Sequence, residues 1–357
     1  MLTAVSIIAL LAAIAIALTV KLPKVPAASG GSVMALAIFT QGVMVHFAGK
    51  GSPGVRVFAA LTLVLWLLHG AAYLSALRFG RFRESYWNDP IGRFAIGTWV
   101  AGTSSALTAA HVNFAELHPV LLVLSIGNAG FLIFYLFAAA LAAGQIAAER
   151  LHGRLHGAIL LTTVSVQSVS LLLHEVFGAR EYMIYRVLVL LGVMFYIAGM
   201  ALLALRYSRK GWKLTEDWLD TNCIMYGAAA ITGAAALQSY VFPSGLLLGI
   251  WVFALLMLLL VEGAELVRAA LRIRRSGWAK GIGVYAPVQW TRLFTLGMFY
   301  FFTSQGERIF PKGDGAAAGV LHELRGWVLN GGAWGIAALL AVEVGLWVSR
   351  MAKSKNS

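Results

Sequence analysis

The sequence predicts an all-α integral membrane protein with about eleven membrane-spanning helices. Hydrophobic residues make up 60% of the 357 residues, charged residues only 12%, and the mean hydropathy is +0.79. A soluble domain usually carries roughly 25% charged residues. In addition, eleven apolar runs have about the 20 residues that a helix needs to cross a bilayer with all its backbone groups satisfied.

The predicted spans follow one another with mostly short connections. They cover residues 2–20, 31–48, 55–77, 94–111, 117–143, 155–175, 182–206, 221–241, 244–267, 288–305 and 326–349. The first run has no basic residue ahead of it and exceeds the core of a signal peptide, which favours a spanning helix over a cleaved leader. We therefore expect an extra helix and cytoplasmic linker at 1–30, a ten-helix pore domain at 31–349 and a basic tail at 350–357.

Basic residues indicate how these spans cross the membrane. If successive connections alternate between the two sides, 21 of the 28 Lys and Arg residues fall on one side. Because positive charge gathers in cytoplasmic loops, the N-terminus is expected outside and the C-terminus in the cytoplasm, in the plasma membrane. The formal charge of +13 therefore sets topology and does not indicate a nucleic-acid partner.

Counted from residue 31, odd and even helices differ in composition. The even ones are rich in Leu, Val and Phe, which suits contact with lipid. The odd ones are small and polar, as in residues 95–110, 161–170, 227–239 and 295–305. Small residues and hydroxyls favour close helix contacts inside a membrane protein, so the odd helices should face inward, either as packing seams or around a pore.

A repeat near the outer ends of the odd helices favours the pore. His46, His111, His174, Gln238 and Gln305 are separated by 65, 63, 64 and 67 residues. Five similar hairpins closed around an axis form a quasi-five-fold ring with the odd helices inside. The five side chains would then form an outer mouth, whose histidines gain charge as the pH falls through about 6.5. Alternatively, each histidine only bonds to a nearby loop.

Polar side chains on the odd helices are the candidates for the pore lining. They are Thr98, Thr103, Ser104, Ser105, Thr162, Ser165, Gln167, Ser168, Thr232 and Thr295. No carboxylate occurs near the middle of these helices, and Glu175 lies at the outer rim. Weak donors without fixed negative charge are typical of a path that binds anions loosely enough to release them. The expected partners are therefore a small anion and the lipid bilayer.

The chain resembles the tellurite-resistance and dicarboxylate transporter family, which includes the slow anion channels. Residues 90–105 (PIGRFAIGTWVAGTSS) and 222–233 (NCIMYGAAAITG), together with the hairpin period, carry the resemblance over about residues 31–349. It implies ten helices in five hairpins, a homotrimer with one pore per subunit, and a phenylalanine on the ninth helix that blocks the pore. By depth, Phe299 is the first candidate for this gate and Phe294 the second; either could instead be a packing aromatic.

The family commonly kinks its inner helices at proline, and glycine would have to supply the bends here. The candidate positions are Gly42, Gly97, Gly102, Gly227, Gly233 and Gly297. Near the cytoplasmic side, Glu262 and Glu265 are expected to form structural ion pairs with Arg292.

Two other functions stay open. A proton-coupled organic-anion carrier needs a protonatable group in the membrane, for which Glu343 or a histidine could serve. A haem- or quinone-binding redox subunit is less favoured, because His69 is the only deep histidine and paired ligands are missing. No nucleophile triad, phosphate loop or metal-ligand run occurs, and Cys223 is a single cysteine. We therefore expect no enzyme, no metal and no cofactor.

Overall fold

The computed structural model describes residues 2–178, 182–311 and 315–355, and within these ranges every regular element is a helix. The helices are α1 (Leu2–Thr19), α2 (Gly30–Phe39), α3 (Val45–Ala48), α4 (Pro53–Arg78), α5 (Gly97–Asn113), α6 (His118–Ala148), α7 (Leu161–Phe177), α8 (Tyr182–Tyr207), α9 (Ile224–Gln238), α10 (Ser244–Gly281), α11 (Gln289–Gln305) and α12 (Ala316–Lys355). A π-helical segment, Thr40–Met44, joins α2 to α3. Arg180 and Lys312, both used in the charge count, lie outside the described ranges.

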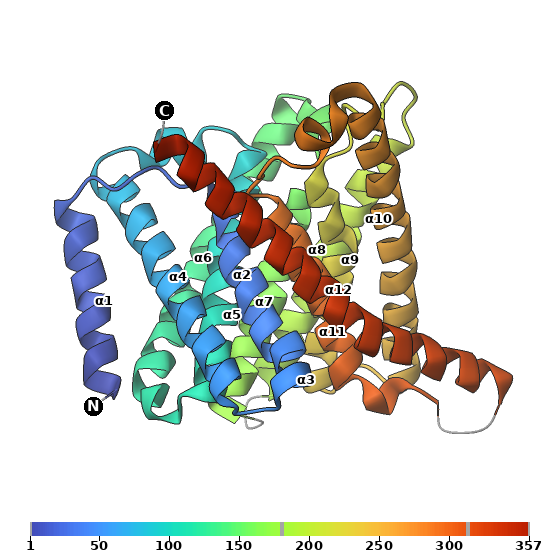
Figure 1. Cartoon of the computed structure of the whole chain (residues 1–357), viewed down its shortest axis with the longest axis horizontal. Helices are drawn as coiled ribbons and strands as arrows, with labels where there is room; N and C mark the ends of the chain where they lie inside the picture. The colour runs from blue at the N-terminus through green and yellow to red at the C-terminus, as the bar shows by residue number, and fades with distance from the viewer. Residues whose placement is uncertain (1, 179–181, 312–314, 356–357) are drawn as a thin grey trace.

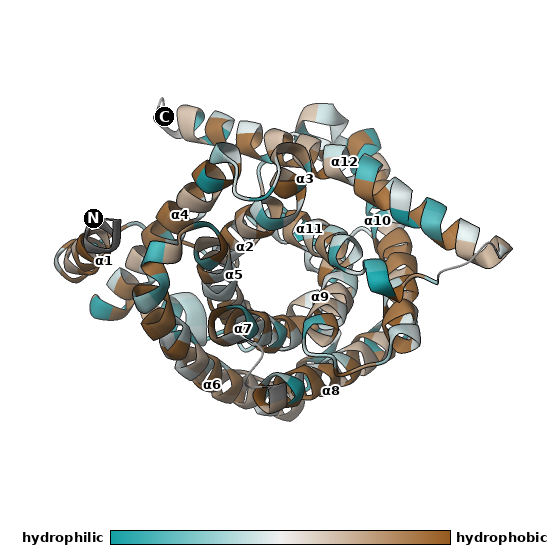
Figure 2. Cartoon of the chain, turned by 90° about the horizontal axis from the view of Figure 1, so that it is seen from below, coloured by the Kyte–Doolittle hydropathy of each residue, from teal (hydrophilic) through white to brown (hydrophobic). Residues whose placement is uncertain are grey.

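Two layers of helices surround a common axis (Figure 2). The inner layer is a closed cycle in which α2 packs against α5, α5 against α7, α7 against α9, α9 against α11, and α11 against α2. Outside it lie α4, α6, α8, α10 and α12, with α1 beyond α4. The two ends of the chain lie at opposite ends of the bundle (Figure 1).

Length and burial separate the two layers. Seven described helical stretches are long and apolar enough to cross a membrane, including the continuous α2–α3 stretch, α7 and the five outer helices. In the most apolar window of α7, 83% of the residues are buried, against 22% in α8, whose side chains suit contact with lipid. The inner helices α5, α9 and α11 have only 17, 15 and 17 residues. Short 3₁₀ turns lengthen α5 and α9 at their N-terminal ends.

Glycine lets the inner helices approach closely and does not bend most of them. A Cβ atom on Gly227 would strike the side chain of Thr295, and one on Gly233 would strike the Phe302 ring. Both glycines lie inside the uninterrupted helix α9. The expectation that all six candidate glycines supply bends is therefore wrong. Gly42 lies in the π-helical segment, and Gly97 lies where a 3₁₀ turn passes into α5, so these two lie at changes of helix type within an inner helical stretch.

The linker after α1 is fastened to the end of α4 and the segment that follows it. Ser75 donates a hydrogen bond to the carbonyl of Val20 and accepts one from the backbone N–H of Leu22. Arg81 donates to the carbonyl of Leu22 at 2.9 Å, and the Tyr86 hydroxyl donates to the carbonyl of Val25 at 2.7 Å. Helix α1 itself packs mainly on α4, outside the two layers.

Enlarging Gly227 should destabilise the bundle. In the Gly227→Val variant, the new side chain meets Thr295 at the contact between α9 and α11, and overpacking of this kind costs about 1–3 kcal/mol. Gly144→Val on α6 is the matched control, because a Cβ there meets nothing within 4 Å. Thermal unfolding in detergent should show a lower midpoint for the α9 variant alone. Equal midpoints would show that the contact is not tight.

Candidate functional site

A cavity of about 180 Å³ lies on the axis of the inner layer. Each of the five inner helical stretches contributes one residue to a common level of its wall: Gln41, Ser105, Ser168, Ile231 and Met298. These positions are separated by 64, 63, 63 and 67 residues, so the hairpin repeat brings equivalent positions to one place. The axis is therefore the candidate functional site.

A second level of the wall lies one helical turn (Val45) or two turns (the other four residues) closer to the C-terminal ends of the inner helices. It consists of Val45, Val112, Glu175, Gln238 and Gln305. Gln238 and Gln305 were expected at the mouth, and both line the cavity. His46, His111 and His174 do not line it; the adjacent residues Val45, Val112 and Glu175 do. One residue turns a helix by about 100°, which carries the three histidine side chains away from the axis.

The histidines contact neighbouring helices instead. His111 lies 3.4 Å from the carboxylate of Glu175 and 3.1 Å from the ring of His118. The ring of His46 stands edge-on to Tyr300, and the ring of His174 stands edge-on to Tyr185. In the part of the chain that the structure describes, no group of three or more His, Cys, Asp or Glu residues could hold a metal ion.

Eight of the ten candidates for the pore lining point elsewhere. None of Thr98, Thr103, Ser104, Thr162, Ser165, Gln167, Thr232 and Thr295 lines the central cavity. Ser104 accepts a hydrogen bond from Asn128 of α6, and Thr103 accepts one from Trp66 of α4, both at 2.9 Å. These two side chains connect α5 to the outer layer.

Other members of this set connect inner helices to one another or to the outer layer. Ser165 donates to the carbonyl of Gly97 at 3.0 Å, which links α7 to α5. The Gln167 amide donates to Val189 of α8 and to Thr232 of α9, at 3.1 and 3.3 Å. Thr98 donates to the carbonyl of Ala27, and the Thr295 hydroxyl lies 3.0 Å from that of Tyr226. Thr162 bonds within its own helical stretch, to the carbonyl of Ile159. Apart from Thr162, the polarity of these side chains therefore stabilises helix packing.

Of the wider set of polar candidates, Ser105 and Ser168 do line the cavity. They share the wall with Thr108 and with the amides of Gln41 and Asn113. The wall also contains two charged side chains, Lys50 and Glu175. The site thus offers hydroxyl and amide groups, one cation, and one carboxylate that has a histidine beside it.

The phenylalanines of α11 face in different directions. Phe299 stacks on Trp251 of α10 with ring centroids 5.7 Å apart, so it points to the outer layer and not to the axis. Phe294, Met298 and Phe301 recur at helical spacing on one face, and Met298 and Phe301 line the cavity. The first choice of gate, Phe299, is therefore wrong in direction. The second choice, Phe294, lies on the face that points to the axis. It is one helical turn before Met298, below the cavity in the sense of closer to the N-terminal ends of the inner helices.

Buried apolar residues follow the same repeat below the polar wall of the cavity. Helical spacing puts Met34, Ala101, Val164, Gly227 and Phe294 one or two turns below the first level of the wall, at intervals of 67, 63, 63 and 67 residues. All five are buried, and Phe294 is the largest, with 1% of its surface exposed. The level below the polar wall is thus apolar and buried.

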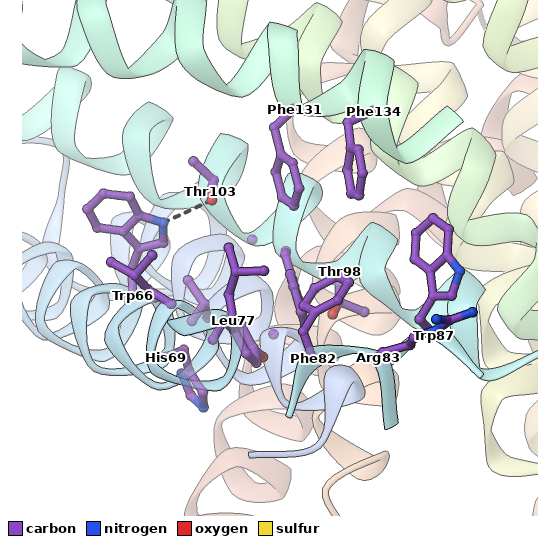
Figure 3. Close-up of a pocket in the computed structure, with 17 residues that line it drawn as sticks. Trp66, His69, Leu77, Phe82, Arg83, Trp87, Thr98, Thr103, Phe131 and Phe134 are labelled. Atoms are coloured by element: carbon purple, nitrogen blue, oxygen red, sulfur yellow. Dashed lines mark hydrogen bonds between the residues drawn. The ribbon is translucent and has the colours of Figure 1, made fainter. Parts of the chain in front are cut away.

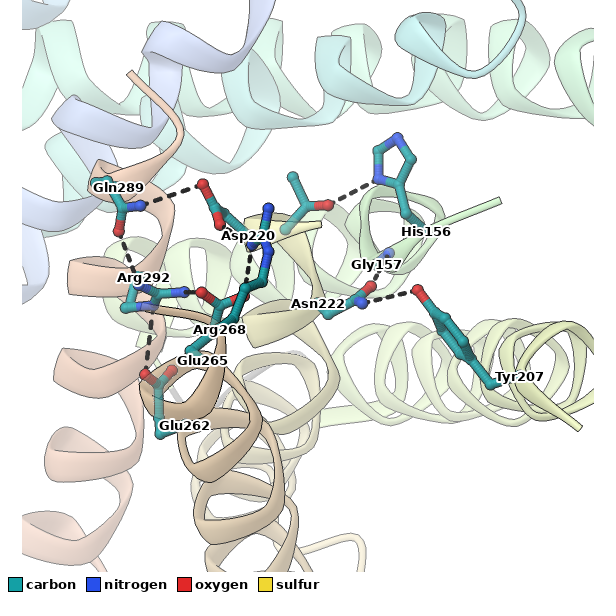
Figure 4. A network of polar contacts seen from close by, with 11 residues as sticks. His156, Gly157, Tyr207, Asp220, Asn222, Glu262, Glu265, Arg268, Gln289 and Arg292 are labelled. Atoms are coloured by element: carbon teal, nitrogen blue, oxygen red, sulfur yellow. Dashed lines mark hydrogen bonds and ion pairs between the residues drawn. The ribbon is translucent and has the colours of Figure 1, made fainter. Parts of the chain in front are cut away.

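Charged residues form a separate network at the opposite end of the inner helices, where α9 and α11 begin (Figure 4). Arg292 pairs with Glu262 at 3.4 Å and with Glu265 at 3.1 Å, so the predicted ion pairs are confirmed. Arg268 pairs with Glu265 at 2.9 Å and also with Asp220. The network fastens α10 to the first turns of α9 and α11.

Glu343 lies outside the central cavity, on α12 in the outer layer. Its side chain is buried, and its Oε1 atom has no hydrogen-bond partner among the described residues. Glu343, the carboxylate considered for proton coupling, therefore does not meet the cavity, whereas Glu175 does.

Cysteine labelling should separate wall residues from packing residues. Native Cys223 is fully buried, so background reaction should be small. A small charged thiol reagent should modify Ser105→Cys and Ser168→Cys in permeabilised membranes, because these positions line the cavity. The controls Ser104→Cys and Ser165→Cys sit one and three residues away but face other helices, and should react far more slowly. Equal labelling of all four would contradict this register.

The chain matches no protein-family model and no curated protein. The cavity and the helices around it are therefore the basis for the function proposed below.

Proposed function

We propose that the protein conducts small anions across the plasma membrane along the axis of the inner helices. One observation carries the proposal: a polar cavity to which all five inner helical stretches contribute at repeated positions, above an apolar level that contains Phe294. In this proposal, ten helices form five hairpins around the pore, and α1 is an eleventh span.

The wall chemistry favours anions of low affinity. Amide and hydroxyl groups surround the cavity, and the cation Lys50 lies in its wall. The carboxylate of Glu175 lies 3.4 Å from the ring of His111. Weak donors without a cluster of fixed charge allow an ion to enter and to leave, as conduction requires.

The uneven basic residues support an orientation with the N-terminus outside. The cavity opens at the end of the inner helices where Gln238 and Gln305 lie, which is the sparsely basic side in the charge count. It would then be an external vestibule. The five-hairpin arrangement and a phenylalanine on α11 also suit the resemblance to the tellurite-resistance family, from which a homotrimer with one pore per subunit follows as a further proposal.

Removal of the Phe294 ring should open the pore. We expect Phe294→Ala to raise chloride efflux from liposomes several-fold, because the ring fills the level below the cavity. Phe299→Ala is the control: it removes a ring of equal size that stacks on Trp251, so it should cost stability, about 3–5 kcal/mol, without raising efflux. Flux through folded Phe294→Ala no greater than wild type would overturn the gate.

A proton-coupled carrier is the second candidate, and the Glu175 contact favours it. A carboxylate on the cavity wall bonded to His111, itself bonded to His118, offers groups that could carry a proton together with an organic anion. The channel, by contrast, needs no proton.

An imposed pH gradient distinguishes the two candidates. For the channel, succinate or chloride flux into vesicles should not depend on the gradient at fixed membrane potential. For the carrier, the gradient should drive uptake, and Glu175→Gln should abolish that drive. The control His46→Gln should retain it, because His46 does not line the cavity. Gradient-driven uptake that survives Glu175→Gln would exclude Glu175 as the coupling group.

A further inference from the structure

A second and larger cavity, about 710 Å³, lies outside the inner layer, between α4, α5, α6 and residues 82–87 (Figure 3). We call it the lateral pocket. Its volume falls within the range of small-molecule and lipid sites. It shares no lining residue with the central cavity. Its occupant is therefore a separate question from the transported ion.

The lateral pocket is a long apolar slot. Along α4 its wall runs from Trp66 to Leu77, a distance of about 17 Å at 1.5 Å per residue. Aromatic rings from three helices and from residues 82–87 line it: Trp66, Tyr73, Phe82, Trp87, Trp99, Phe131 and Phe134. Such a slot suits a hydrocarbon chain.

The few polar groups in the wall are already paired within the protein. The Trp66 indole donates to Thr103, the Thr98 hydroxyl donates to the carbonyl of Ala27, and His69 Nδ1 bonds to the carbonyl of Leu65 at 3.0 Å. A polar solute would find few groups to bind, whereas an apolar chain has no hydrogen bonds to water to give up when it enters.

The pocket opens to the lipid side of the bundle. Two of its lining residues, Leu77 and Phe134, are 58% and 41% exposed on the outer helices α4 and α6. A lipid can therefore enter sideways from the bilayer without passing through the protein.

One cation lies at the end of the slot. Arg83 lines the pocket just beyond the end of α4 and is exposed. Its guanidinium has no hydrogen bond or ion pair among the described residues, whereas the nearby Arg81 is bonded to the linker. Glu84, beside it in sequence, does not line the pocket. A free cation at the membrane interface attracts an anionic headgroup.

We propose that the lateral pocket binds an anionic phospholipid, with one acyl chain in the aromatic slot and the phosphate on Arg83. The apolar wall selects the chain, and the single free guanidinium selects the negative headgroup. A membrane quinone would need the same slot but would bond to His69 and gain nothing from Arg83, so the charge at the rim favours the phospholipid.

Gly70 offers a way to fill the slot without disturbing the fold. It lines the pocket on α4, and a Cβ there would meet nothing within 4 Å. The matched control is Gly127→Leu on α6, which also meets nothing within 4 Å and lies outside the pocket.

The experiment is to purify the full chain from vesicles that contain phosphatidylglycerol and phosphatidylcholine and to measure retained lipid by native mass spectrometry. Wild type and Gly127→Leu should retain phosphatidylglycerol, and Gly70→Leu should lose it. Arg83→Gln should keep a bound lipid but reduce the preference for phosphatidylglycerol about fivefold, as expected for one basic residue near an anionic headgroup.

Two results would overturn the proposal. One is equal retention of phosphatidylglycerol by Gly70→Leu and wild type, provided that each is a folded, monodisperse protein. The other is a quinone in the extract in place of phospholipid, identified by its ultraviolet spectrum and mass. Because no anion gradient is applied, neither result depends on whether the protein conducts anions.

Discussion

Hydrocarbon offers no hydrogen-bond partners, and this constraint organises the whole molecule. Each polar side chain on an inner helix must bond to its own backbone, bond to another helix, or face a cavity. Most take the first two routes: Ser165 bonds to Gly97 of α5, and Gln167 bonds to both α8 and α9. Only the few that also face the cavity can form an ion path, so polarity alone does not identify a pore lining.

The sequence was sufficient for the features that depend on composition and period. Composition, the length of the apolar runs and the charge distribution predict an all-α membrane protein, and the hairpin repeat identifies sets of positions that lie at one level. It was not sufficient for the direction of each side chain around its helix. Ser104 and Ser105 have the same chemistry and adjacent positions, yet one bonds to α6 and the other lines the cavity. A rotation of 100° per residue separates these outcomes.

The choice between Phe299 and Phe294 failed for the same reason. Depth along α11 favours Phe299, but depth says nothing about direction. The helical series that contains Met298, Phe301 and Gln305 could have indicated Phe294, since Gln305 was already expected at the mouth and Phe294 lies eleven residues before it, three helical turns on the same face. Phe299 stacks on Trp251, which lies 48 residues earlier in the chain, on α10. No local sequence pattern reveals this contact.

If the cavity carries anions, as proposed, the donors of its wall favour weak binding. The hydroxyl of Ser168 donates to the carbonyl of Ser165, and that of Thr108 to the carbonyl of Ser104, both at 2.9 Å. The Gln41 amide donates to Ala37 at 3.2 Å. An arriving anion must replace these bonds, each with a net value of about 0.5–1.5 kcal/mol, so it exchanges one partner for another and gains little. A wall that holds its donors in this way favours passage over retention.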